Sequence, residues 1–254
     1  MTIVGYTSAM ADLTYISAGN SKTECFSFDL PAKITCPGMT AACGEKCYAY
    51  NLMRAYTNVD AKYQRNLEFA NTDAFVPHMI RCIPRRCEFR MHVSGDMYSA
   101  AYIAKWIDIC SERPDVIFYT YTRSWRNPEL WELIQALATL PNVNVNLSVD
   151  DETGKPEVDN AESFRWCYLT HDDNTPEWIR SGDIVFRSAH GGQKKRRKND
   201  EKKGIDPDIR SPLVHKLGAG TVCPMERGKD MPKHFSCATC HLCVDKPKGV
   251  AVNA

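Results

Sequence analysis

The chain has 254 residues, of which 43% are hydrophobic, so it can bury the core of one α/β domain, alone or with a small appended module. Its 32 basic and 31 acidic residues give a formal net charge of +1, which does not commit the whole molecule to nucleic acid or to a membrane surface. No apolar run approaches the roughly 20 residues that cross a bilayer, and the first residues lack a signal-peptide pattern. We therefore expect a cytoplasmic protein with reduced cysteines, of which two clusters are candidate metal ligands. The other five are expected to be small core residues: Cys25, Cys82, Cys87, Cys110 and Cys167.

The first predicted strand, 24–30, is followed by three cysteines in a C-x6-C-x3-C spacing: Cys36, Cys43 and Cys47. Three thiolate ligands would leave one iron of a cluster open to a substrate or cofactor, as open metal positions do in catalysis. The alternatives are that two of these thiols only pack, or that Cys43 and Cys47 lie one helical turn apart and stabilise a loop without metal. One or two helices are predicted over 51–83, with a break near Asn71 and Thr72.

The second predicted strand, 88–93, is followed by a turn that contains Gly95 and Asp96. A helix is predicted from Ser99 to Glu112. The Asp96 carboxylate and the start of that helix would address a polar ligand together, or form an ordinary turn and cap. Gly95, Asp96, Tyr98 and Ser99 are thus the candidate cofactor-binding residues, and Ser99 is also a candidate N-cap.

The third predicted strand, 116–122, is followed by Arg123, which would contact a carboxylate or phosphate in a bidentate manner or form a surface ion pair. Arg123 and Asp96 are the candidate catalytic residues. Asn127 is a candidate cap and Pro128 suits the first position of the next helix. Further strands are predicted at 143–149, 166–170 and 184–187, and a short helix is predicted to begin at Thr175.

Strands that alternate with helices predict parallel strands joined by crossovers, in a doubly wound sheet or in a complete or partial β/α barrel. Polar residues follow most of the predicted strands, as at the functional end of a TIM-like barrel. These strand-end groups are 94–96, 121–124, 150–151, 170–172 and 188–190. The sequence therefore favours a barrel-like α/β domain over residues 1–192, with a small-molecule ligand at its mouth.

A basic segment, 193–210, is predicted to be a mobile loop or linker because its first part has no aliphatic residue. Its run Lys194–Lys198 would hold a phosphate backbone weakly and in a salt-dependent manner. No aromatic residues are interleaved for base stacking. Nucleic-acid binding is therefore a secondary hypothesis.

The segment 211–254 contains four further cysteines and few large apolar residues, so a metal is expected to fix it. Cys223 precedes a proline, and Cys237, Cys240 and Cys243 form a C-x2-C-x2-C run. These are the elements of a bacterial ferredoxin set, with the Cys-Pro placed before the run, and they predict a [4Fe-4S] cluster. Zinc is the alternative metal, because four thiolates also form a closed tetrahedral site.

The same motifs resemble those of the bacteriophage "gene product 88" family. The resemblance rests on Cys36-Pro37-Gly38, Cys43, Cys47-Tyr48-Ala49, the stretch 94–99, the stretch 121–124 and the final cysteines. It implies a phage-type protein located in the host cytoplasm.

More distantly, the cysteine loop after the first strand and the Gly-acid turn after the second resemble radical S-adenosylmethionine enzymes, which are partial or full β/α barrels. The usual C-x3-C-x2-C is replaced here by C-x6-C-x3-C. The resemblance implies a barrel-like iron–sulfur fold, with S-adenosylmethionine as a candidate ligand. Two functions follow: an iron–sulfur protein in electron transfer or redox chemistry, or a non-enzymatic protein stapled by a cluster or zinc that binds nucleic acid or a host protein.

Overall fold

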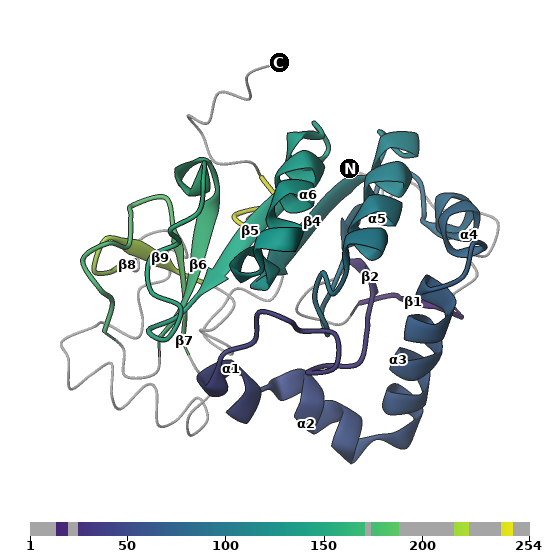
Figure 1. Ribbon diagram of the computed structural model, residues 1–254, viewed down its shortest axis with the longest axis horizontal. Helices are drawn as coiled ribbons and strands as arrows, with labels where there is room; N and C mark the ends of the chain where they lie inside the picture. The colour runs from purple at the N-terminus through teal and green to yellow at the C-terminus, as the bar shows by residue number, and fades with distance from the viewer. Residues whose placement is uncertain (1–13, 20–24, 171–173, 188–215, 224–239, 246–254) are drawn as a thin grey trace, which may run out of the picture.

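The described part of the chain forms an α/β fold around one mostly parallel sheet (Figure 1). The computed structural model describes residues 14–19, 25–170, 174–187, 216–223 and 240–245. Within these residues the sheet has nine strands in the order β1-β2-β3-β4-β5-β6-β7-β9-β8. Neighbours from β2 to β9 pair in parallel, whereas β1 and β8 pair antiparallel at the two edges.

All six predicted strands are confirmed, most of them within two residues of their expected bounds. They are β2 (Phe26–Phe28), β3 (Glu88–Arg90), β4 (Ile117–Thr122), β5 (Val143–Val149), β6 (Arg165–Thr170) and β7 (Ile184–Arg187). The sequence did not predict the short edge strand β1 (Ile16–Ser17), or β8 (Lys216–Leu217) and β9 (Gly220–Val222). These three are two or three residues long, too short to show a periodicity.

The helices follow the predicted caps. Ser99 Oγ accepts the Tyr102 N–H at the start of α5 (Ala100–Glu112), and Asn127 Oδ1 accepts the Glu129 N–H at the start of α6 (Pro128–Thr139). The expected break at residues 71–74 is confirmed. It separates α3 (Thr57–Ala70) from α4 (Phe75–Cys82), and α1 (Ala41–Glu45) and α2 (Tyr48–Ala55) precede them. The range 51–83 thus holds parts of three helices rather than one or two, because the chain also breaks at Tyr56 between α2 and α3.

One expected helix is wrong. Residues 175–182 form turns instead, with the Ile179 N–H bonded to the Pro176 carbonyl. Arg180 donates from its backbone and its guanidinium to Asp183, which directly precedes β7. These contacts close the segment into turns directly before β7.

The strand order decides between the expected architectures. From β2 to β7 the strands lie side by side in chain order, and α4, α5 and α6 contact one another along one face of the sheet (Figure 1). A doubly wound sheet has helices on both faces, so that alternative is wrong for the described residues. A closed TIM-like barrel is not formed by them either, since the sheet ends at β1 and β8 without pairing of its edges.

The main core lies between the sheet and these helices. Trp106 of α5 packs against Phe89 of β3 and Phe118 of β4, and all three side chains are fully buried. Side chains alternate along each strand, so the residues between these core positions point to the opposite face of the sheet. We call that opposite side the helix-free face, because α4, α5 and α6 all pack on the other side of the sheet. It carries Tyr119, Tyr121 and Cys167.

Residues 216–223 complete the same sheet, and residues 240–245 lie on its helix-free face. Both segments follow the basic stretch that the sequence suggested as a linker. No helix among the described residues is long and apolar enough to cross a membrane.

Candidate functional site

The three N-terminal cysteines lie at the carboxyl edge of the sheet, after β2. Cys43 belongs to α1 and Cys47 is the N-cap of α2, where its sulfur accepts the Tyr50 N–H. The two thiols therefore belong to different helices, and the alternative of a single helical turn is wrong. Cys36 precedes α1 in the connecting loop, and all three residues are partly buried. We call the segment 36–47 the cysteine loop.

Glycine is required where the cysteine loop meets the strand ends. A Cβ on Gly38 would lie 1.9 Å from the carbonyl oxygen of Arg123. Gly95 has a φ of +84°, and a Cβ there would meet Leu30 Cβ and Thr35 Oγ1 at 2.6 Å. Gly38 therefore lets the loop contact the backbone of Arg123, and Gly95 leaves room for the side chains of Leu30 and Thr35.

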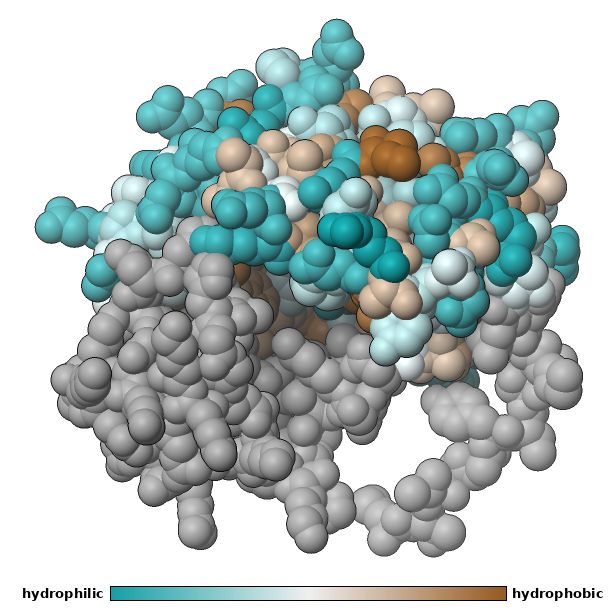
Figure 2. All heavy atoms as spheres, turned by 90° about the horizontal axis from the view of Figure 1, so that it is seen from below, coloured by the Kyte–Doolittle hydropathy of each residue, from teal (hydrophilic) through white to brown (hydrophobic). Residues whose placement is uncertain are grey.

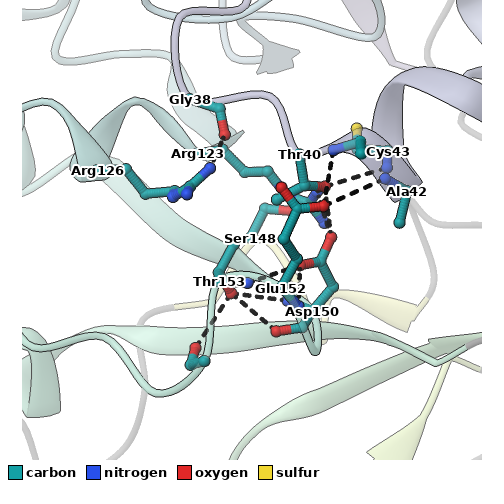
Figure 3. Close-up of polar contacts among 12 residues, drawn as sticks. Gly38, Thr40, Ala42, Cys43, Arg123, Arg126, Ser148, Asp150, Glu152 and Thr153 are labelled. Atoms are coloured by element: carbon teal, nitrogen blue, oxygen red, sulfur yellow. Dashed lines mark hydrogen bonds and ion pairs between the residues drawn. The ribbon is translucent and has the colours of Figure 1, made fainter.

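A buried ionic group joins the cysteine loop to the ends of β4 and β5 (Figure 3). Arg123 Nη1 lies 2.7 Å from Asp150 Oδ2 and donates to Thr40 Oγ1 at 2.9 Å. Thr40 in turn donates to Asp150 and accepts the Cys43 N–H, so it caps α1. Glu152 accepts the N–H groups of Ala41 and Ala42 at the same helix end. The loop is thus fixed by contacts to groups more than 80 residues away in the sequence.

The arrangement changes the interpretation of Arg123. The sequence offered either a surface ion pair or a free contact to an anion, and the structure shows a buried pair, with 6% of the Arg123 side chain and 1% of the Asp150 side chain exposed. Among the described residues, Nε of Arg123 has no hydrogen-bond partner. Arg123 therefore acts first as an anchor of the cysteine loop.

Asp96 is also an internal connector. Its carboxylate accepts the Met97 N–H at 2.7 Å and the Arg123 N–H at 2.8 Å, which joins the turn after β3 to the end of β4. Burial raises the pKa of Asp96, while hydrogen bonds from Thr122, Arg123 and Met97 act in the opposite direction. The convergence of Asp96, Arg123 and Asp150 was expected, because the carboxyl ends of parallel strands meet at one edge.

The N-terminal thiols are close enough to influence one another. Burial raises the pKa of Cys36 to about 12, and the charge of Asp96 and the thiols of Cys43 and Cys47 act in the same direction. Burial also raises the pKa of Cys43, whereas Arg123 lowers it. Without metal, these two thiols are therefore protonated at neutral pH.

Tyr98 and Ser99 are directed elsewhere. The Tyr98 hydroxyl donates to Asn71 Oδ1 and its ring stacks on Tyr102 at 4.6 Å between centroids, so it belongs to the helix side of the sheet. Ser99 is occupied as the N-cap of α5. Of the four candidate cofactor-binding residues, Gly95 and Asp96 adjoin the cysteine loop.

The C-terminal cysteines lie on the helix-free face. Cys223 follows β9, and both it and Cys243 pack in one cluster with Cys167 of β6. The charges of Cys243 and Cys223 add to burial in raising the pKa of Cys167. Cys240 is close enough to Cys243 to raise the pKa of the Cys243 thiol. Cys237 lies outside the described residues.

The segment 240–245 is held on the sheet by side chains that donate to its backbone carbonyls. Asn144 donates to the carbonyls of Cys243 and Asp245, and Asn146 donates to that of Cys243. Arg165 donates to the carbonyls of Leu242 and Asp245. A hydrogen bond to a backbone carbonyl does not depend on which side chain that residue carries. These contacts therefore fix the path of the segment and not its sequence.

Sequence reasoning missed these anchors, although a signal was present. The stretch 143–149 alternates apolar residues with Asn144, Asn146 and Ser148, and this alternation marks a strand with one polar face. Cys167 was expected to be a small core residue, and it is fully buried. Its position beside two other cysteines depends on the registers of β6 with β7 and of β7 with β9, and on the path of residues 240–245, which periodicity does not give.

Within the described residues, no three or more His, Cys, Asp or Glu side chains are grouped as ligands of a metal ion. This finding concerns one shared ion. Thiolates on a single zinc lie within about 4 Å of each other because the Zn–S distance is about 2.3 Å, whereas cubane ligands are wider apart because each binds a different iron. The basic run Lys194–Lys198 lies outside the described residues.

The surface near the cysteine loop is mixed in character. Figure 2, which views the molecule from below, shows hydrophilic residues interspersed with hydrophobic ones. Most of the exposed large apolar residues come from the loop and from α2 or its end: Ile34, Met39, Tyr48, Leu52 and Tyr56. Tyr48 is 59% exposed, yet its hydroxyl points inward and donates to the Val93 carbonyl.

These features define a mostly parallel α/β protein with one cysteine group at the carboxyl edge of its sheet and another on its helix-free face. The chain belongs to the Gene product 88 family, which matches residues 5–246. This confirms the resemblance to the phage family, whereas the comparisons do not support a relationship to radical S-adenosylmethionine enzymes.

Two curated phage proteins are similar over part of their length. The Gene 88 protein of Mycobacterium phage L5 is 29% identical over 102 residues, which cover 35% of this chain and 43% of that protein. The Gene 88 protein of Mycobacterium phage D29 is 28% identical over 102 residues, covering 35% and 42%. The matched region thus spans less than half of either relative. No solved structure matches the chain.

Proposed function

We propose that this protein is an iron–sulfur protein in which Cys223, Cys237, Cys240 and Cys243 hold a [4Fe-4S] cluster. The observation that carries the proposal is the meeting of Cys223 and Cys243 on the helix-free face, in one cluster of side chains. Cys223 comes from the sheet and Cys243 from a segment held there by hydrogen bonds to its carbonyls. Cys237, from the same C-x2-C-x2-C run, would supply the fourth thiolate.

The surroundings of Cys243 fit a thiolate ligand. Burial raises the pKa of its thiol, whereas the neighbouring Tyr121 hydroxyl and the charges of Arg165 and Arg90 lower it. Metal binding replaces the proton of each thiol, so a positive environment with a hydrogen-bond donor supports ligation. Zinc would use the same thiols and is the competing metal.

Four thiolates on four irons leave no iron open, so the role proposed for this cluster is structural stabilisation or electron transfer. A cluster would tie the segment 240–245 to the end of β9. Such a connection supports structural stabilisation by the metal as part of the function. Redox chemistry on a bound ligand would belong to the second group of thiols.

That second group is Cys36, Cys43 and Cys47, which we include in the proposal as a three-thiolate site. It is supported by the fixation of the cysteine loop to strand ends and by the electrostatic proximity of its three thiols. Three ligands would leave one iron for a small molecule, and S-adenosylmethionine is one candidate ligand by resemblance alone.

The test is anaerobic purification followed by quantification of iron, sulfide and zinc. We expect iron and sulfide together with broad absorption near about 400 nm, the usual signature of a thiolate-bound [4Fe-4S] cluster. The double variant Cys240→Ser, Cys243→Ser should lose about four irons, and the triple variant Cys36→Ser, Cys43→Ser, Cys47→Ser should lose only those of a second cluster.

The matched control is Cys110→Ala, which removes a buried thiol from α5 on the helix side. It should keep the full content of iron and sulfide. Zinc without iron in the anaerobic protein would refute the cluster, and equal metal loss in Cys110→Ala would show that the losses reflect unfolding.

A further inference from the structure

Three exposed arginines lie between the end of α4 and the start of β3. Arg81 is in the last turn of α4, and Arg85 and Arg86 belong to the turn that leads into β3. This turn precedes β3, whereas the cysteine loop follows the parallel strand β2, so the two lie at opposite ends of the strands. We call the three residues the arginine patch.

The backbone of the arginine patch is held by a buried arginine, Arg113, which is the C-cap of α5. Its guanidinium donates to three carbonyls at the end of α4 and in the turn, those of Ile80, Ile83 and Pro84. It also contacts both carboxylate oxygens of Asp115, at 2.8 and 3.1 Å. Arg113 thus satisfies carbonyls that a helix end leaves without a partner, and it fixes the turn.

Arg86 is held in an unusual backbone conformation by the same group. Its φ is +53°, and its N–H is bonded to Asp115 Oδ2 at 3.3 Å. This left-handed region favours glycine, because a Cβ crowds the backbone there. The hydrogen bonds from Arg113 lower the pKa of Asp115 to about 2, so Asp115 stays charged and bound to Arg113. The chain therefore carries a positive charge at a position whose backbone suits glycine.

The arginine patch has no counter-charge. In the part of the chain that the structure describes, none of its three side chains forms a hydrogen bond or an ion pair, although ion pairs are resolved for Arg113, Arg123 and Arg180. The neighbouring carboxylate, Asp115, is occupied by Arg113. Three positive charges are thus concentrated within a few residues of a chain whose net charge is only +1.

The surroundings of the patch fit phosphate better than a protein or a single strand. Protein interfaces depend on aromatic and apolar anchors, and single-strand binding depends on exposed aromatic rings. Among the described residues, Ile117 is the one exposed large apolar residue at this end of the strands, where its N–H bonds to the Cys87 carbonyl. The exposed aromatic rings, Tyr48 and Tyr56, belong to α2 and its end. Arginines presented without such groups suit the sugar-phosphate backbone of a duplex.

We propose that the arginine patch binds the phosphate backbone of double-stranded DNA. Arg81, Arg85 and Arg86 each neutralise a phosphate, and the contacts carry no base preference. Binding weakens as salt rises, because each contact releases counterions from the duplex. The inference goes beyond the proposed function and does not depend on iron or sulfide.

The inference is tested by fluorescence anisotropy of a short labelled duplex of mixed sequence, titrated with the full chain at several salt concentrations. The triple variant Arg81→Gln, Arg85→Gln, Arg86→Gln should bind about tenfold more weakly or worse. Its slope of log affinity against log salt should be less steep by about 2–3, since each phosphate contact contributes about 0.9. The three side chains are exposed, so the midpoint of denaturant unfolding should stay that of the wild type.

Two variants serve as controls. Arg81→Lys, Arg85→Lys, Arg86→Lys keeps the charges and should keep most of the affinity and the slope. Arg54→Gln removes an exposed charge from α2, near the other end of the strands, and should change neither. Equal losses in the glutamine and the lysine triple variants would overturn the inference, because the charge would then not be the cause.

Other outcomes would assign the binding elsewhere. Wild-type affinity and slope in the glutamine triple variant would overturn the inference, and so would a wild type that does not bind the duplex. If neutralising Lys194–Lys198 abolished binding while the glutamine triple variant bound normally, the basic run would be the site. Tighter binding to poly-glutamate or to a single strand than to the duplex would replace double-stranded DNA by an acidic protein or by single-stranded nucleic acid.

Discussion

The two cysteine groups are held in place by different forces. The cysteine loop is fixed through the buried Arg123–Asp150 pair and through Thr40, and Asp96 joins the strand ends beside it. The segment 240–245 is attached mainly through hydrogen bonds from sheet side chains to its carbonyls and through half-buried thiols. The first group therefore has a buried ionic scaffold, whereas the second is held by hydrogen bonds to its carbonyls and by the contact of His241 with Glu88. Metal loss should release the segment before it disturbs the loop.

The largest effect is expected from the ionic anchor of the cysteine loop. Asp150→Asn leaves the Arg123 guanidinium buried without a counter-ion, and we expect the free energy of unfolding to fall by about 3–5 kcal/mol. The change is measured by denaturant unfolding of the metal-free protein. Arg123→Met combined with Asp150→Leu removes both charges and should recover most of the loss.

Glu162→Gln is the matched control, because it breaks the pair with Lys155 on the surface. Exposed pairs contribute little to stability, so its effect should be small. Similar losses in Asp150→Asn and Glu162→Gln would show that the buried pair is not an anchor. The claim that a buried ion pair fixes the cysteine loop would then be wrong.

A smaller and more local effect is expected for the C-terminal segment. Asn144→Leu removes two hydrogen bonds, to the carbonyls of Cys243 and Asp245. At about 0.5–1.5 kcal/mol for each bond, local opening of residues 240–245 should become roughly tenfold more frequent. Amide hydrogen exchange of the metal-free protein measures this opening.

Asn142→Leu is a demanding control, since Asn142 donates to three carbonyls next to α5 and β4. It should lower global stability without selectively exposing residues 240–245. Selective exposure in both variants, or in neither, would contradict the idea that Asn144 holds the segment. Exchange in the cluster-containing protein should be slower in both.

Local signals in the sequence account for most of the fold. The apolar run 143–149 predicts β5, and Asn127 with Pro128 predicts the start of α6, because strand pattern and cap chemistry act over a few residues. The expected helix at Thr175 failed because Asp183 and the nearby start of β7 dictate the path of the chain. Local propensity does not contain that tertiary constraint.

The candidate site was predictable only in part. Asp96 and Arg123 could be placed at one edge because parallel strands end together, and the structure brings them within one hydrogen bond. The commitment of Arg123 to Asp150 was not predictable, since it depends on side-chain packing between neighbouring strand ends. The meeting of Cys167 with Cys223 and Cys243 depends on where the segment 240–245 crosses the sheet, which no local pattern specifies.

The smallest predicted effect is a pH dependence of stability that differs between the metal-free and the metal-bound cysteine loop. The pKa of Cys36 is raised from 9.0 to about 12 in the folded protein, mainly by burial. Below pH 9 the thiol is protonated in both the folded and the unfolded state, so it adds no pH dependence. Between about pH 9 and 12 only the unfolded state has released the proton, so the folded state loses stability as the pH rises, by at most about 1.4 kcal/mol per pH unit.

Denaturant unfolding of the metal-free, reduced protein from pH 8 to about 10.5 should therefore show a steeper decline for the wild type than for Cys36→Ser. Parallel curves would mean that Cys36 ionises normally in the folded state. In the iron-loaded protein the difference should vanish, because a ligating thiolate has already released its proton, and a difference that persisted there would remove Cys36 from the proposed ligands.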